Sequence, residues 1–218
     1  MLKNLKISYK VYIPLVVFAV VLIAITSAFS YFSIKNIEKD VLKKTEIKLK
    51  NFFNLKIEEK KSVGITNAIN IANNLYVIKA LKENNRDIAI KGLKKLSKDF
   101  KKNTKFKSVK IQIHTKDIRS FIRLWKLDKY GDDLSSFRKT IVKVSNTKKP
   151  LSAIEVGKFG LFLRGIAPVI ENNKYLGSVE FMQGLDSISR DAKKLGYEVV
   201  VVMDLKYSNI ATFLKHLK

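Results

Sequence analysis

Arginine is rare in this sequence and concentrated in one part of it. The chain has 37 lysines and only six arginines. Arg119, Arg123 and Arg138 lie within "IRSFIRLWKLDKYGDDLSSFR" (residues 118–138), and Arg164 follows 26 positions later. A guanidinium group is a planar fork that meets a carboxylate or phosphate in two parallel hydrogen bonds, whereas an ammonium group is a hydrated point charge. In a chain that otherwise uses lysine, these arginines predict recognition of a small anion.

Aromatic residues alternate with the arginines at positions 119, 121, 123 and 125. An extended backbone would place all four on one face. A helix would place one arginine over the other and one aromatic residue over the other. Forked donors beside flat apolar surface suit an anion with an apolar or amino-bearing part. Polar residues within predicted strands complete the set of candidate ligand-binding residues: His114, Arg119, Phe121, Arg123, Trp125, Arg138, Arg164 and Glu180.

Each of these residues also has a structural role open to it. An arginine here can pair with an acidic residue and hold a loop, the candidates being Asp132, Asp133 and Glu155. Trp125 is a core residue in most such settings, and His114 as a structural residue would hydrogen-bond only a backbone group. The sequence leaves both interpretations open.

Patterns of catalysis and metal binding are missing from the sequence. It contains no G-x-S-x-G, H-E-x-x-H or phosphate-loop motif. With no cysteine and two histidines, thiolate chemistry and zinc sites built on cysteine are excluded, and a nucleophile–base pair has little to draw on. We therefore expect no enzyme activity, no metal and no cofactor. A hydrolase would require Asp132, Glu155 and Glu180 to share one open cavity.

The formal net charge of +24 first suggests a polyanionic partner. The excess is nearly all lysine, however, and is spread from Lys3 to Lys218 without a dense block. We expect no nucleic-acid partner.

Residues 11–34, "VYIPLVVFAVVLIAITSAFSYFSI", carry no charge between Lys10 and Lys35. As a helix these 24 residues extend about 36 Å, enough to cross a hydrocarbon core of roughly 30 Å. A cleaved signal peptide would have an apolar run of about 7–15 residues and a small-x-small site, which "TSAFS" matches poorly. We predict a membrane helix over 11–34.

The lysines of residues 1–10 are not balanced by acids, so this tail should stay cytoplasmic under the positive-inside rule. The rest of the chain then lies outside a bacterial inner membrane that it crosses once. No later apolar run is long enough to span, since "VVVVM" (199–203) is the size of a strand.

Residues 35–105 have a pattern typical of helices, with no proline and with apolar residues at helical spacing. We predict a long stalk helix to about residue 80 and a second helix that begins at Asp87. Asp132 or Asp133 should cap a helix that continues to about Val144.

From Phe106 the pattern changes to period-two segments that predict strands. Gly157–Gly160 should join two of these, and "ENNK" (171–174) should form a hairpin turn. A short helix should begin at Asp186 and end near Gly196. The strands are expected over 108–115, 151–158, 160–171, 175–185 and 197–205, with a further helix over 208–218. An α+β fold results, in which a helical stalk carries an antiparallel sheet.

Four blocks in this order resemble the extracytoplasmic double Cache sensor domain, of the Cache 3-like type, in bacterial methyl-accepting chemotaxis proteins. They are "IHTKDIRSFIRLW", "GDDLSSFRKTIVKV", "KPLSAIEVGKFGLFLRGIAPVI" and "YLGSVEFMQGLDSISRDAKKLGYEVVVVMD". The membrane helix and stalk are similar too, so the likeness covers nearly the whole chain. Similar sensor domains occur on histidine kinases and diguanylate cyclases.

The resemblance implies a periplasmic chemotaxis sensor in which a PAS-like, membrane-distal module over residues 106–195 holds a small-molecule pocket. Residues 196–218 would begin a membrane-proximal module that is incomplete here. A full receptor would continue through a second membrane helix, a HAMP linker and a signalling coiled coil, so a truncated receptor is expected. We also expect a homodimer through the stalk; an anchored interaction protein without signalling is the alternative.

Overall fold

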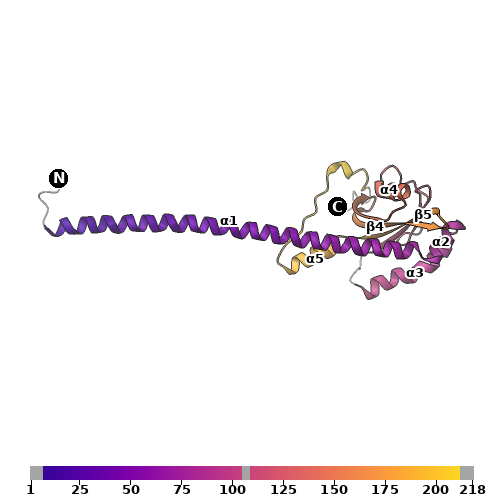
Figure 1. Ribbon diagram of the computed structural model, residues 1–218, viewed down its shortest axis with the longest axis horizontal. Coiled ribbons are helices and arrows are strands. Elements are labelled where there is room, and N and C mark those ends of the chain that lie inside the picture. The colour runs from indigo at the N-terminus through magenta and orange to yellow at the C-terminus, as the bar shows by residue number, and fades with distance from the viewer. Residues whose placement is uncertain (1–6, 105–108, 212–218) are drawn as a thin grey trace. The chain divides into compact units, whose positions relative to one another are not determined.

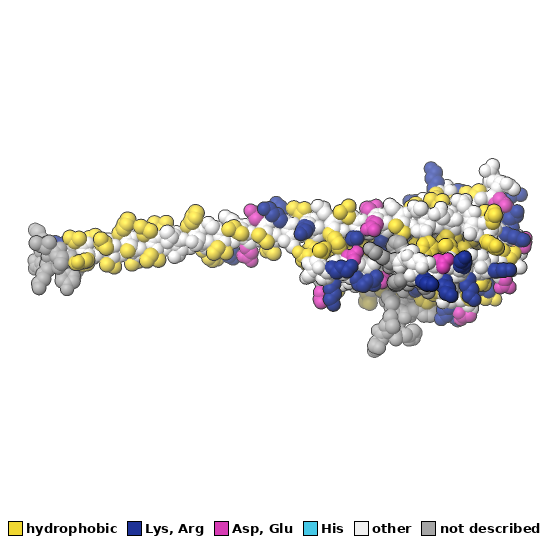
Figure 2. Space-filling model, turned by 90° about the horizontal axis from the view of Figure 1, so that it is seen from below, with side chains coloured by type: hydrophobic (Ala, Val, Ile, Leu, Met, Phe, Trp, Pro, Cys, Tyr) yellow, Lys and Arg dark blue, Asp and Glu magenta, His cyan; other side chains and the backbone are white. Residues whose placement is uncertain are grey.

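The computed structural model describes residues 7–104 and 109–211 (Figure 1). The chain divides into two compact units, residues 1–54 and residues 55–218. The described part of the first unit is a single helix, the beginning of α1 (Ile7–Ala72). Apolar side chains are exposed along it (Figure 2). Within the described residues, α1 is the one helix long and apolar enough to cross a membrane.

Helices form the N-terminal part of the second unit, as predicted, but the long helix ends earlier than expected. The helix is interrupted at Asn73, and the side chain of Asn74 accepts a hydrogen bond from the backbone of Tyr76. This cap begins α2 (Leu75–Lys82). The second predicted helix is confirmed as α3 (Arg86–Asn103), which Asn85 caps.

Five antiparallel strands form one sheet in the order β2-β1-β5-β4-β3. The glycine-bounded turn between β3 and β4 and the "ENNK" hairpin are both confirmed. Asn172 and Asn173 have positive φ angles of 47° and 61°, the conformation that a two-residue hairpin turn needs. The strands are β1 (Lys110–Thr115), β2 (Ser120–Arg123), β3 (Leu151–Gly157), β4 (Gly160–Glu171) and β5 (Lys174–Gln183).

The sheet separates two environments. Residues 55–72 of α1, together with α2 and α3, cover one face and enclose the main apolar core, which includes Ile113, Val179 and Phe181. α4 (Lys139–Thr147) packs on the other face through Ile141 and Val144. Burial of apolar surface on both faces holds the sheet between helices.

Helix α1 approaches the sheet most closely where two glycines meet. A β-carbon on Gly165 of β4 would lie 2.1 Å from the carbonyl carbon of Gly64. One turn away, the buried Lys60 donates from Nζ to the carbonyl oxygen of Gly184 (2.9 Å). Its own carbonyl oxygen accepts from Nε2 of Gln183 (2.8 Å). Backbone and side chain therefore both fix α1 to the end of β5.

Two predicted elements differ in the structure. The helix expected from Asp132 or Asp133 begins only at Lys139, because Asp133 caps a turn at Ser135 instead. The strand expected over 197–205 is extended through residue 204 but unpaired, since no described segment lies beside it as a ladder partner. Residues 205–207 form a short 3₁₀ turn.

The remaining C-terminal elements are only partly described. α5 (Asp186–Lys194) confirms the short helix predicted from Asp186. Most of the helix predicted over 208–218 lies outside the described residues.

We expect Gly165→Ala to lower the free energy of unfolding by about 1–3 kcal/mol, because the added β-carbon would meet backbone atoms that cannot rotate away. Urea unfolding of the full chain in neutral detergent, followed by the fluorescence of Trp125, measures this loss. Gly64→Ala is the matched control. Its β-carbon would meet its nearest neighbours at 3.2 Å, and alanine favours a helix, so it should cost less. Equal losses would contradict the explanation.

Candidate functional site

The face of the sheet toward α4 carries polar and charged side chains. Side chains alternate across a strand, and the pairing of β1 and β5 places Gln112 opposite Glu180 and His114 opposite Ser178 on this face. The pairing of β4 and β5 adds Arg164, opposite Met182. A buried polar layer thus lies on this face beside the small apolar cluster that packs under α4.

Glu180 is the centre of this layer and is fully buried. One of its oxygens, Oε1, accepts hydrogen bonds from Arg138 and from Nη1 of Arg164 (2.8 Å). Arg138 also donates from Nε to Glu155 (2.7 Å), which Thr140 holds through its backbone and hydroxyl groups. Burial alone would raise the pKa of Glu180, but the two guanidinium groups hold this pKa well below its usual range.

Gly157 is required for this arrangement. A β-carbon there would lie 2.5 Å from Nη2 of Arg164. Arg164 also donates to the backbone oxygen of Glu155 (3.1 Å) and contacts the sulfur of Met182 (3.0 Å). The absence of a side chain at Gly157 therefore leaves the space that the Nη2 end of the guanidinium group occupies.

His114 lies behind Glu180 and is also fully buried. Its Nδ1 is 2.9 Å from the hydroxyl of Ser178, and its Nε2 is 3.6 Å from the second Glu180 oxygen, Oε2. Ser178, His114 and Glu180 have the order of a serine–histidine–acid triad, but no substrate can reach a serine with no exposed surface. Burial lowers the pKa of His114, so the ring is neutral in the folded chain.

A second ionic cluster lies nearer the surface. Arg123 donates from Nη1 and Nη2 to the two oxygens of Asp132, at 2.7 Å and 2.9 Å. Lys158 donates to the same carboxylate at 2.8 Å. Partial burial would raise the pKa of Asp132, but the two cations hold this pKa far below its ordinary value. One acid therefore serves two cations here.

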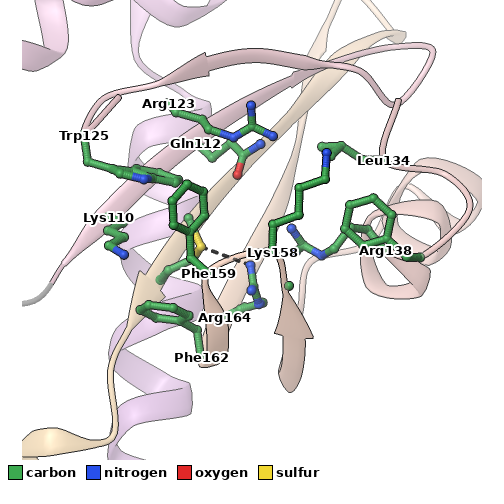
Figure 3. Close-up of a pocket in the computed structure, with 13 residues that line it drawn as sticks. Lys110, Gln112, Arg123, Trp125, Leu134, Arg138, Lys158, Phe159, Phe162 and Arg164 are labelled. Atoms are coloured by element: carbon green, nitrogen blue, oxygen red, sulfur yellow. Dashed lines mark hydrogen bonds between the residues drawn. The ribbon is translucent and has the colours of Figure 1, made fainter. Parts of the chain in front are cut away.

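Between these clusters lies a small cavity with a basic and aromatic lining (Figure 3). Its volume of about 20 Å³ is enough for a water molecule. A cleft of about 320 Å³ adjoins it, and Arg123, Lys158 and Phe159 line both. The 13 residues around the cavity include no acid: Lys110, Gln112, Arg123, Trp125, Leu134, Phe137, Arg138, Gly157, Lys158, Phe159, Phe162, Arg164 and Met182.

The structure brings six of the eight predicted residues together. Arg123, Trp125, Arg138 and Arg164 line the cavity. Glu180 pairs with the last two of these, and His114 lies against Glu180. The predicted residues also make the structural ion pairs that the sequence left open, since Arg123 pairs with Asp132 and Arg138 with Glu155.

Arg119 and Phe121 lie elsewhere, because the pairing of β1 with β2 is irregular between Ile113 and His114. This shift places Phe121 in the apolar core on the opposite face. Arg119 is exposed and binds Asp117 (3.3 Å) and the backbone oxygen of Gly131 (2.9 Å). The prediction that positions 119 to 125 share a face is therefore wrong.

Sequence reasoning missed the residues at the turn between β3 and β4. Lys158 and Phe159 occupy this turn and separate the cavity from the cleft. The glycines at 157 and 160 predicted the turn, but only the pairing of the strands shows that its tip reaches Trp125, whose ring centre lies 5.8 Å from that of Phe159.

Arg86, at the start of α3, is a second omission. It donates to the backbone oxygens of Phe121 (2.9 Å) and Leu127 (2.6 Å). Its guanidinium carbon lies 3.4 Å from the ring centre of Tyr130, which lines the cleft. Arg86 therefore positions the wall of the cleft without lining it.

The chain belongs to the double Cache family, since the family model described as the double sensory domain of two-component sensor kinases matches residues 51–213. Its membership makes this chain a sensory domain with the fold described above. The recognised likeness to double Cache sensor domains is thereby confirmed. None of the curated proteins matches the sequence.

Two solved structures share the fold. The sensor domain of the histidine kinase DctB from V. cholerae matches with a TM-score of 0.54 and 13% identity, over 70% of this chain and 59% of that chain. The E. coli DcuS sensor domain matches with a TM-score of 0.50 and 14% identity, over 64% of this chain and 98% of that chain. This chain thus spans less than two thirds of the DctB domain.

A chemoreceptor structure is similar at a lower level. The ligand-binding domain of Campylobacter jejuni Tlp3, solved with 4-methylisoleucine, matches with a TM-score of 0.30 and 9% identity. The match covers 59% of this chain and 62% of that chain.

We expect the free energy of unfolding to decrease as the pH falls below about 6.5, the ordinary pKa of histidine, because the unfolded chain binds a proton that buried His114 does not. The slope should be at most about 1.4 kcal/mol per pH unit. Urea unfolding of the full chain between pH 7 and pH 5 measures it. His114→Gln should flatten this slope, and His216→Gln controls for loss of an imidazole. An unchanged slope in His114→Gln would contradict the prediction.

Proposed function

We propose that this chain is the extracytoplasmic ligand-sensing region of a membrane-anchored receptor and that its basic cavity binds a small carboxylate-bearing anion. One observation carries the proposal. The cavity lining contains five cationic and four aromatic side chains and none of the acids that the structure describes. Cations beside aromatic rings suit a ligand with a negative head and an apolar body.

The charges of the two clusters favour one end of the cavity for the anionic head. Arg138 and Arg164 are balanced by Glu155 and Glu180, so the inner cluster is neutral. In the outer cluster a single acid, Asp132, faces both Arg123 and Lys158. The head of the ligand therefore binds at Arg123 and Lys158, and Trp125 and Phe159 pack on its body.

Binding requires the cavity to enlarge. A volume of about 20 Å³ excludes an amino or organic acid, whereas the cleft of about 320 Å³ reaches the size of small-ligand sites. The tip of the β3–β4 turn, Lys158 and Phe159, lines both spaces. Displacement of this tip joins them into one pocket.

Anchoring in a membrane follows from α1. Its residues 11–34 are uncharged, and the described apolar side chains among them are exposed. Burying such a surface in lipid is strongly favourable. The lysines of residues 1–10 favour a cytoplasmic N-terminus, which places the sensory domain outside a bacterial inner membrane.

Two kinds of receptor carry such domains. The family description and the similarity to the sensor domain of the histidine kinase DctB support a two-component sensor kinase. The sequence resemblance favours a chemotaxis receptor, and the Tlp3 match is too distant to add weight. Ligand sensing is common to both, so the proposal is independent of the output. A hydrolase has less support, because the three acids that it would need in one open cavity are all paired with arginine, and of these three only Asp132 lines the cleft.

A second copy of this chain is the partner that we propose for the stalk. Apolar residues remain exposed after the membrane segment, and each of Ile37, Val41 and Leu42 is more than half exposed. Pairing of two helices would bury them.

We expect Ile37→Cys to crosslink two chains on mild oxidation in neutral detergent, because apolar faces of paired helices place equivalent positions side by side. A dimer band on non-reducing electrophoresis measures the reaction. Lys39→Cys, two residues along the same helix, is the control and should crosslink less. Absence of a dimer from both variants would exclude pairing of the stalks.

We expect a carboxylate from a panel of amino and organic acids to raise the melting temperature of the full chain in neutral detergent. Arg123→Lys should weaken this binding at least about tenfold, or 1.4 kcal/mol, because an ammonium group cannot make the paired bonds of the fork. Its stability without ligand should change less. Arg119→Lys, outside the cavity, is the control. A chain that no acid stabilises would argue against the proposed function.

A further inference from the structure

Asp132 already makes with the guanidinium group of Arg123 the contact that a ligand carboxylate would make. Its two oxygens meet the two Nη atoms of Arg123 in parallel, at 2.7 Å and 2.9 Å, and one of them also accepts from Lys158 at 2.8 Å. This two-oxygen geometry is the one in which guanidinium recognises a carboxylate. The fork is thus shaped for a planar carboxylate and is filled by one from the chain itself.

The three acids of the site differ in how easily they could leave it. The side chain of Glu180 has no exposed surface and that of Glu155 is 14% exposed, so both are enclosed by their arginines. The side chain of Asp132 is 30% exposed, whereas that of its partner Arg123 is 6% exposed. Asp132 can therefore turn into water while the arginine remains in place.

Asp132 also helps to keep the cavity closed. Arg123 and Lys158 line both the small cavity and the larger cleft, whereas Asp132 lines only the cleft. By binding Lys158, Asp132 holds the tip of the β3–β4 turn, which lines the cavity. The ion pair and the closed cavity therefore depend on the same contact.

We infer that Asp132 is an internal competitor for the ligand, and that the carboxylate of the ligand replaces it on Arg123 and Lys158. This inference rests on the proposed function and specifies its ligand class, a carboxylate small enough to pass between the cleft and the cavity. The exchange leaves the buried Arg123 paired in both states, so neither state contains an isolated buried charge. It also releases the tip of the turn, which opens the cavity.

Competition has a measurable consequence, because each ligand must displace an acid that is covalently held nearby. Removing the acid should therefore raise affinity, although it removes a favourable contact from the free protein. The opposite result is expected if Asp132 merely supports the shape of a site that other residues form.

The experiment uses the full chain in neutral detergent with sodium acetate as the probe, at an ionic strength kept constant with sodium chloride. Binding is followed by the fluorescence of Trp125 and by the melting temperature. We expect Asp132→Asn to bind acetate at least about tenfold more tightly than the wild type. Asp128→Asn is the matched control, since Asp128 lines the same cleft and loses the same charge but makes none of the described ion pairs with Arg123 or Lys158.

Asp132→Ala provides a second test, because it leaves a space that acetate can fill. Acetate should raise its melting temperature more than that of the wild type, and should restore the fold, where chloride does not, if either variant unfolds without it. Equal, weaker or absent acetate binding in both variants overturns the inference. The proposed function fails separately, if no acid in the panel stabilises the wild-type chain.

Discussion

The buried pairing of Glu180 with Arg138 and Arg164 is the interaction on which the rest of the site depends. Removing one member of such a group leaves an unpaired charge in a dry interior, at a cost of about 3–5 kcal/mol. Its members come from β5, from the residue preceding α4 and from β4. The pairing thus fixes three separate segments around one carboxylate. Both arginines also line the cavity.

Unlike this fully buried group, the outer cluster of Asp132, Arg123 and Lys158 is partly exposed to solvent. Asp132 is shared by two cations and is partly exposed, and it lies at the entrance to the cavity. A sensory domain needs both kinds of group, since a rigid base keeps the geometry of the site constant while an exchangeable contact responds to a ligand. Under the proposed function, the inner acids stabilise the site and the outer acid responds to the ligand.

The sequence predicted the sheet well, because turns depend on local residues such as Gly157, Gly160 and the asparagine pair of "ENNK". The clustering of arginine also singled out Arg123, Arg138 and Arg164, which the structure brings together around the candidate cavity. Three kinds of feature were inaccessible. An irregularity of strand pairing moved Phe121 to the other face, Asp133 preferred a turn to a helix cap, and the extended segment 197–204 has no described partner to make it a strand. The strand pairing and the missing ladder partner depend on contacts between separate segments, which local periodicity does not encode. The turn at Asp133 is local, but an aspartate can cap a turn as readily as a helix.

The contact of Gly64 with Gly165 has a mechanical consequence. Most helices pack on sheets through side chains, which can change rotamer to accommodate small displacements. Here the two main chains touch, and the adjacent Arg164 reaches the cavity. A displacement of β4 toward α1 by a fraction of an ångström must therefore move α1 at that point, because no side chain lies between the two main chains.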